Sequence, residues 1–157
     1  MQVVEKDILA VERGIICHQV NPHGMMDEGL ALQIRNRWPV VYEKYKARRP
    51  RLGEVQLVRV APGLEVANIC SQDGHGHNEA HTNMVAMRVA FCRISAMIPK
   101  FIAPDELHFP HGFGCGLSGE DWEEVSALIE QFFPKATICS VEKMGERLRE
   151  RARRDSQ

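Results

Sequence analysis

The sequence predicts an α/β protein in which helices cover both faces of a sheet. Short apolar runs rich in β-branched residues, typical of buried strands, alternate along the chain with segments whose apolar residues recur at helical spacing. Of the 157 residues, 44% are hydrophobic and 26% charged, as in an ordinary globular domain. Because no repeat, low-complexity segment or linker divides the chain, we expect a single domain over residues 1–157, with a basic tail from about residue 143.

The first 60 residues of the chain are expected to hold two strands and two helices. Residues 14–20 (GIICHQV) form a short β-branched run that indicates a buried strand. Residues 28–38 carry apolar side chains at helical spacing, with Asp27 as the expected N-cap, and Pro39 suits the first turn of a second helix. Residues 54–60 alternate between polar and apolar, as a half-exposed strand does.

The rest of the chain is expected to continue this alternation. A helix is predicted after a glycine-rich loop, because Ser118 and Asp121 have the spacing of a capping box. The other expected elements are strands over residues 64–72, 105–109 and 136–141 and a helix over residues 77–98.

Charge and composition narrow the class of protein. The 20 lysines and arginines nearly balance the 21 aspartates and glutamates, which argues against a dedicated nucleic-acid or membrane-surface binder. The basic stretch 35–51 is interpreted as a solvated helix face, with an anion-attracting patch as the alternative. The five cysteines form no CxxC pair, the N-terminus lacks a signal-peptide pattern, and no run approaches the ~20 apolar residues of a membrane helix. We expect a cytoplasmic protein without a membrane partner, and a monomer.

Two glycine-bearing loops each lead from a predicted strand into a predicted helix. One is residues 17–33 (CHQVNPHGMMDEGLALQ), and the other is residues 109–122 (FPHGFGCGLSGEDW). Backbone N–H groups at a helix start attract anions, and glycines let phosphate oxygens approach closely. Open α/β sheets bind ligands at the carboxyl edge of their strands. The hypothesis is that both loops clamp one diphosphate, and the alternative is that they are tight structural turns.

These segments resemble the macrodomain family, whose members bind ADP-ribose. KDILAV is similar to the family's opening G-D-I/L element, with Lys6 in place of glycine. The first loop is similar to V-N followed by M-G-x-G-x-A, and the second to P-x-x-G-C-G-L-x-x-x-x-W. The resemblance spans roughly residues 3–141 and implies a three-layer α/β/α sandwich with a mixed central sheet. G-C-G-L with a tryptophan resembles the subgroup of terminal ADP-ribose protein glycohydrolases, DNA ADP-ribosyl glycohydrolase antitoxins and yeast-type ADP-ribose 1″-phosphate phosphatases.

The resemblance also implies ligand contacts. The Asp7 carboxylate would accept a hydrogen bond from the adenine amino group, Asn21 would contact the distal ribose, and the two loops would wrap the diphosphate with backbone amides. The implied ligand-binding residues are Asp7, Ile8, Asn21, Gly24, Gly29, Gln72, Gly112, Phe113, Gly114, Cys115, Gly116 and Leu117.

The chain departs from the glycohydrolases of this subgroup at their catalytic pair. Ser71 and Gln72 stand where those enzymes have a lysine, and Ser118 stands where they have an aspartate, so their covalent mechanism is not expected. His23 and Asp27 are the candidate catalytic residues, because a histidine beside a carboxylate suits general acid–base work. The alternatives are a solvated loop histidine and a helix N-cap.

Other histidines are weighed separately. His18 is interpreted as a buried strand histidine with a satisfied hydrogen bond. His75, His77 and His81 have a spacing that zinc ligands use, but a polar loop is favoured, and no metal or cofactor is expected.

The expected function is therefore ADP-ribose binding, with hydrolysis of an ADP-ribose derivative: either phosphatase-like action on ADP-ribose 1″-phosphate or removal of ADP-ribose from a macromolecule. The alternative is a non-catalytic reader of ADP-ribosylated protein or nucleic acid.

Overall fold

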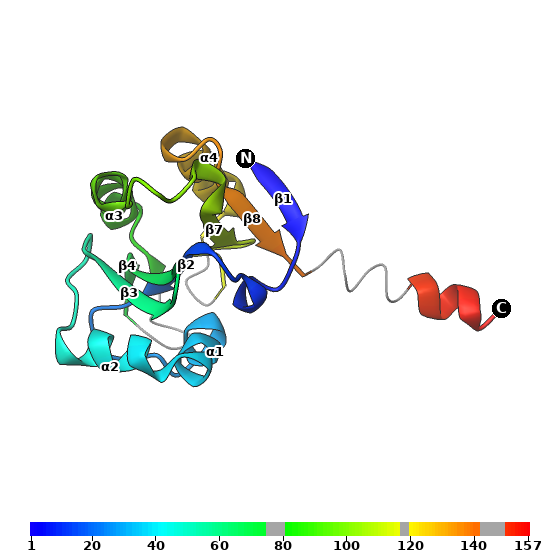
Figure 1. Cartoon of the computed structure of the whole chain (residues 1–157), viewed down its shortest axis with the longest axis horizontal. Helices are drawn as coiled ribbons and strands as arrows, with labels where there is room; N and C mark the ends of the chain where they lie inside the picture. The colour runs from blue at the N-terminus through cyan, green and yellow to red at the C-terminus, as the bar shows by residue number, and fades with distance from the viewer. Residues whose placement is uncertain (75–80, 117–119, 142–149) are drawn as a thin grey trace.

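The computed structural model, which describes residues 1–74, 81–116, 120–141 and 150–157, is a three-layer α/β/α sandwich with a mixed central sheet, as predicted. In Figure 1, helices α1 and α2 lie on one side of the sheet and α3 and α4 on the other. The helices are α1 (Gly29–Arg37), α2 (Pro39–Ala47), α3 (Met84–Met97) and α4 (Trp122–Phe132). The strands of the main sheet are β1 (Gln2–Glu5), β2 (Gly14–Val20), β3 (Val55–Ala61), β4 (Leu64–Cys70), β7 (Leu107–Pro110) and β8 (Thr137–Ser140).

The strand order of the main sheet, β1-β8-β7-β2-β4-β3, positions the two glycine loops. All neighbouring strands are parallel except β3, which pairs antiparallel with β4 at one edge. Because β2 and β7 are parallel neighbours, the loops that follow them leave the same edge of the sheet side by side. The sequence alone did not order these strands.

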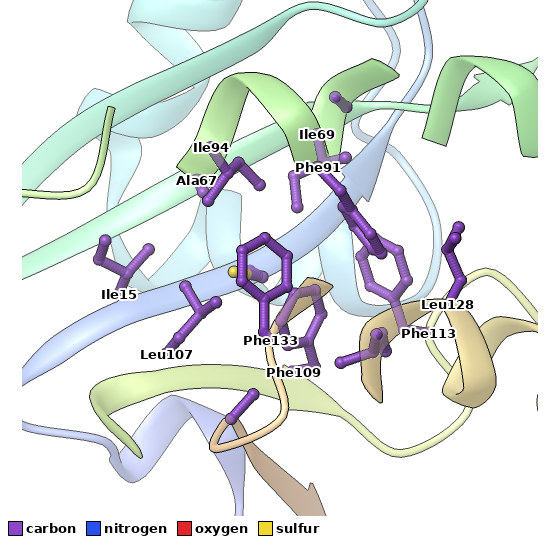
Figure 2. Packing of buried hydrophobic residues seen from close by; sticks show 14 of the residues in the cluster. Ile15, Ala67, Ile69, Phe91, Ile94, Leu107, Phe109, Phe113, Leu128 and Phe133 are labelled. Carbon is purple, nitrogen blue, oxygen red and sulfur yellow. The ribbon is translucent and has the colours of Figure 1, made fainter. Parts of the chain in front are cut away.

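One hydrophobic cluster fills each side of the sheet. Against α3 and α4, Phe91 contacts the rings of Phe109 and Phe133 edge-on, at centroid distances of 5.6 and 5.4 Å (Figure 2). Against α1 and α2, the buried side chains of Ile34 and Tyr45 pack on strand residues of β2 and β4. Burying side chains of this size stabilises the fold by about 1.5–3 kcal/mol each.

Helix α1 begins differently from the prediction. Its N-cap is Glu28, and Asp27 lies one residue outside the helix. The Glu28 side chain makes no capping hydrogen bond, so the expected cap at Asp27 was wrong and no side chain replaces it.

Helix α3 begins seven residues later than predicted. The Asn83 side chain caps it by accepting a hydrogen bond from the Ala86 amide, at 2.9 Å. Before this cap, β6 (His81–Thr82) pairs with β5 (Gln72–Asp73) as a small separate ribbon. The predicted helical residues before His81 lie outside the described part of the chain. The Asn83 cap and the pairing of β6 with β5 together explain why α3 begins later than predicted.

The capping box predicted for α4 is also corrected. Asp121 is itself the N-cap, because its carboxylate accepts a hydrogen bond from the Glu123 amide at 2.9 Å. Ser118 lies outside the described residues.

Two short 3-10 turns complete the fold: η1 (Ile8–Ala10) and η2 (Pro104–Glu106). Within the described part of the chain, no helix has the length and apolar character needed to span a membrane. Residues 150–155 are helical and exposed. The single-domain organisation and the basic tail from about residue 143 stay predictions.

Candidate ligand-binding cleft

A cleft with two adjoining lobes lies at the carboxyl edge of β2 and β7. One lobe, of about 220 Å³, lies between the start of α1 and the glycine loop after β7, and we call it the loop lobe. The other, of about 300 Å³, includes Asp7 and Ile8 and is called the Asp7 lobe. Leu30, Pro110 and His111 line both lobes, so the two form one elongated depression.

The start of α1 supplies unoccupied amide donors to the loop lobe. Gly29, Leu30 and Ala31 line this lobe, and the first helical amide with a backbone partner is that of Leu32, which donates to the Glu28 carbonyl at 3.2 Å. Among the described residues, no partner is found for the amides of Gly29, Leu30 and Ala31. Amides at a helix N-terminus carry a partial positive charge, so this end of α1 favours an anionic group.

The glycine loop after β7 forms the facing wall. Gly112 and Gly114 have φ angles of +79° and +74°, which only glycine adopts readily. Two turns consume part of the loop's hydrogen-bonding capacity, because the Phe113 amide donates to Pro110 and the Cys115 amide to Gly112. These two amides have partners within the loop, so the predicted wrapping of a diphosphate depends on the other amides of the loop.

Two positions in this wall are open. An added Cβ at Gly112 or Gly116 would meet no described atom within 4 Å, whereas one at Gly114 would lie 3.1 Å from the Met87 methyl group. The wall is further shaped by His111, whose ring centroid lies 4.8 Å from that of Trp122 on α4. Side chains are absent at Gly112 and Gly116 where the cleft needs space.

The first loop is tied to the protein rather than to the cleft. The Asn21 side chain donates to the Met25 carbonyl and accepts from the His23 amide, both at 2.9 Å. The Gly24 amide donates to the buried hydroxyl of Tyr45 at 3.1 Å. Burial is the main cause that raises the pKa of Tyr45 to about 12, so this hydroxyl stays neutral and holds the loop.

In the Asp7 lobe, the Asp7 carboxylate is exposed and caps η1 through the Leu9 amide at 3.0 Å. Ile8 is buried beside it. Phe113, in contrast, is 2% exposed and packs edge-on against Phe109, so most of its ring belongs to the core.

His18 reaches the loop lobe from β2. It is 1% exposed and its Nε2 is hydrogen-bonded to Asn68 Oδ1 on β4. Burial lowers the pKa of His18 to about 4, so the ring is neutral near pH 7. The sequence-based interpretation of a buried strand histidine with a hydrogen bond is confirmed. The second ring nitrogen, Nδ1, has no hydrogen-bond partner among the described residues.

The predicted site residues divide into three groups. Those on the cleft are Asp7, Ile8, Gly29, Gln72, Gly112, Phe113, Gly114 and Gly116. Those outside its lining are Asn21, Gly24 and Cys115 and the catalytic candidates His23 and Asp27. Leu117 lies outside the described residues.

Several residues of the lining are not among the predicted site residues. Glu28 and His18 line the loop lobe, and His111 lines both lobes. The position of Glu28 immediately before α1 was the available signal, since the N-cap of a helix faces whatever its N-terminus faces.

A metal site is not supported by the residues that can be seen. His81 lies 3.6 Å from the Asp73 carboxylate, and His75 and His77 lie outside the described residues. Within the described part of the chain, no group of three or more histidine, cysteine, aspartate or glutamate side chains is arranged to hold a metal ion.

Comparison with solved structures places this fold. A protein from Bacteroides thetaiotaomicron is 23% identical with a TM-score of 0.73, covering 89% of this chain and 99% of its own. A macrodomain protein from Streptomyces coelicolor is 25% identical with a TM-score of 0.68, covering 88% and 97%. DarTG of Thermosipho africanus, solved in complex with ADP-ribose, is 19% identical with a TM-score of 0.70, covering 88% of this chain and 40% of that longer one. A scan of protein-family models and a search of curated proteins gave no match.

The class defined by fold and cleft is an α/β/α sandwich whose ligand-sized depression lies at the carboxyl edge of parallel strands. Within that class, the chain has the fold of the macrodomains among these solved structures.

Proposed function

We propose that this chain binds ADP-ribose in the two-lobed cleft. The observation that carries the proposal is the uncapped N-terminus of α1, whose amides at Gly29, Leu30 and Ala31 open onto the loop lobe. A diphosphate placed there receives several N–H donors and the favourable end of the helix dipole. The adenine then occupies the Asp7 lobe, where a carboxylate accepts from its amino group, and the distal ribose occupies the loop lobe.

One solved structure supports ADP-ribose as the ligand. DarTG of Thermosipho africanus was solved in complex with ADP-ribose, and the match to its fold covers 88% of this chain. We propose the same ligand for this chain because its own cleft has the amide donors and the carboxylate that ADP-ribose requires.

Calorimetry with ADP-ribose tests the proposal, with Gly116→Val as the blocking variant. Gly116 lines the loop lobe, its backbone is outside the left-handed region, and an added side chain meets no described atom within 4 Å. The valine therefore fills ligand space without straining the fold. We expect the variant to keep the wild-type melting temperature and to lose at least about tenfold in affinity, or 1.4 kcal/mol.

Ala96→Val is the matched control, because it adds branched volume at an exposed position of α3 outside both lobes. It should bind like the wild type. Absence of binding by the unaltered chain at millimolar ADP-ribose would refute the proposed function.

Hydrolysis of an ADP-ribose derivative is the second candidate function, and one observation favours it: Glu28, an acidic residue, lines the lobe assigned to the distal ribose. A carboxylate there has the chemistry to accept a proton from an attacking water. Turnover of ADP-ribose 1″-phosphate and of ADP-ribosylated protein or nucleic acid should fall in Glu28→Gln. The previously considered His23→Ala and Asp27→Ala, which lie outside the lining, serve as comparisons. Binding without turnover on any of these substrates would leave the reader function.

A further inference from the structure

We propose that His18 is a specificity-determining residue of the cleft, whose Nδ1 accepts a hydrogen bond from a hydroxyl of the ligand's distal sugar. This inference rests on the proposed function, since it assigns a role within the same loop lobe. It stands on a row of polar side chains that crosses three strands of the sheet.

The row runs from the edge of the sheet to the cleft. Gln56 on β3, Asn68 on β4 and His18 on β2 occupy paired positions in the two strand ladders. Their neighbours two residues away, such as Val58, Val66 and Ile16, belong to the cluster under α1 and α2, so all three side chains of the row project to that face. A polar row in an otherwise apolar layer is costly unless each member is hydrogen-bonded.

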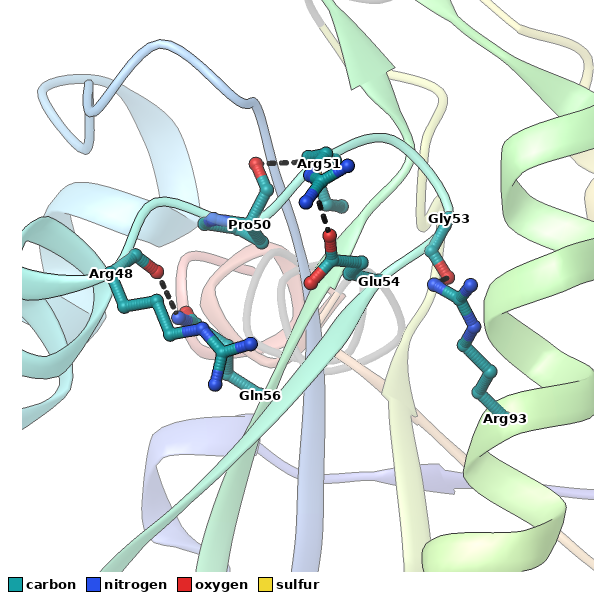
Figure 3. A network of polar contacts seen from close by, with 8 residues as sticks. Arg48, Pro50, Arg51, Gly53, Glu54, Gln56 and Arg93 are labelled. Atoms are coloured by element: carbon teal, nitrogen blue, oxygen red, sulfur yellow. Dashed lines mark hydrogen bonds and ion pairs between the residues drawn. The ribbon is translucent and has the colours of Figure 1, made fainter.

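The hydrogen bonds of the row have only one consistent direction. The backbone carbonyl of Arg48 can only accept, so Gln56 presents its amide nitrogen to it, at 2.6 Å (Figure 3). The Gln56 carbonyl oxygen therefore accepts from the Asn68 side-chain nitrogen, at 3.2 Å. This leaves the Asn68 carbonyl oxygen facing His18 Nε2, which must carry the proton.

The consequence is a histidine locked in one tautomer. With the proton on Nε2, and with the pKa of the ring lowered to about 4 by burial, Nδ1 carries a lone pair and no hydrogen. Nδ1 is itself buried, and no described protein atom hydrogen-bonds it. An unpaired buried acceptor is unfavourable, and the lining position of His18 makes the cleft the place from which a donor can come.

The donor required is a neutral O–H. The diphosphate bridge of ADP-ribose is fully ionised at neutral pH and offers none, and it is directed instead to the amides of Gly29, Leu30 and Ala31. A sugar hydroxyl next to the diphosphate has the needed chemistry. His18 would therefore distinguish ADP-ribose from ADP, which ends at the phosphate.

The experiment compares ADP-ribose with ADP on the full chain and on His18→Gln. Glutamine keeps an N–H near the position of Nε2, so it preserves the bond to Asn68 while removing Nδ1. We expect affinity for ADP-ribose to fall by about tenfold and affinity for ADP to change by less than about twofold. His18→Asn, which places a carbonyl oxygen near the position of Nδ1, should recover part of the preference for ADP-ribose.

Two further readouts do not depend on a variant that folds. Nitrogen NMR of the histidine rings in the unaltered chain should show His18 as the Nε2–H tautomer. An ADP-ribose analogue without distal-ribose hydroxyls should bind the unaltered chain at least about tenfold more weakly than ADP-ribose does.

The outcomes separate the two proposals. If the unaltered chain fails to bind ADP-ribose, the proposed function falls and this inference with it. Suppose instead that the unaltered chain binds ADP-ribose. Only this inference is then overturned if His18→Gln binds ADP-ribose equally well, or if its affinity for ADP falls as much as its affinity for ADP-ribose. The Nδ1–H tautomer in the NMR measurement would overturn it as well.

Discussion

Replacing Tyr45 with phenylalanine is expected to destabilise the protein although it removes a single oxygen atom. The Tyr45 side chain is fully buried on α2, and its hydroxyl donates to the Asn21 backbone carbonyl at 2.6 Å. The same oxygen accepts from the Gly24 amide at 3.1 Å. One hydroxyl thus holds two backbone groups of the first loop, at Asn21 and Gly24.

The magnitude follows from these two contacts. A net hydrogen bond contributes about 1 kcal/mol, and a buried group left without a partner costs about 1–3 kcal/mol. Phenylalanine fills nearly the same volume, so no term for a new cavity is added. We expect Tyr45→Phe to lower the free energy of unfolding by about 2–3 kcal/mol.

Urea denaturation followed by tryptophan fluorescence measures this loss, with an unchanged slope m as evidence that the folded state keeps its compactness. Tyr42→Phe is the matched control, since it is the other tyrosine of the chain, lies on the same helix, and packs its ring against the Arg35 guanidinium at 3.8 Å. No hydrogen bond of the Tyr42 hydroxyl is found among the described residues, so a change below about 0.5 kcal/mol is expected. Equal losses in the two variants would refute the reasoning.

Three further predictions test other parts of the structure. First, stability should fall as pH drops from 6.5 to about 4, because the unfolded state binds a proton at His18 in this window and the folded state does not. The loss attributable to His18 is about 3 kcal/mol. A slope that is smaller in His18→Gln supports the assignment, and an unchanged slope contradicts it. Second, Gly14→Ala should lower the melting temperature far more than Gly63→Ala. Both glycines have positive φ, but an added Cβ would lie 2.1 Å from the Glu106 carbonyl oxygen at Gly14 and 3.6 Å from the nearest Arg13 atom at Gly63. Similar losses in the two variants would contradict this packing. Third, a thiol reagent applied to the folded protein should label exposed Cys92 first, while Cys17, whose pKa burial raises well above its usual value, reacts only on unfolding; labelling of Cys17 at the same rate would exclude the buried placement.

The sequence by itself determined the kind of most of the helices and of most strands of the main sheet, and it indicated that the two glycine loops leave the sheet at the same edge. The β-branched run at residues 14–20 became β2 with the same boundaries, and Pro39 is the first residue of α2. These features depend on side-chain periodicity and on the fixed φ of proline, which act over a few neighbouring residues. The two glycine loops were recognisable for the same reason.

Only the tertiary structure decided which atoms face the cleft. The Gly24 amide turns inward because Tyr45, 21 residues away, supplies its acceptor, and the His18 tautomer depends on Asn68, 50 residues away. Asp27 and Glu28 are neighbours of equal charge, yet only Glu28 lines the lobe, since the helix begins directly after it. Hydrogen-bond partners distant in the chain meet only once the strand order is set, and that order is a property of the packed sheet.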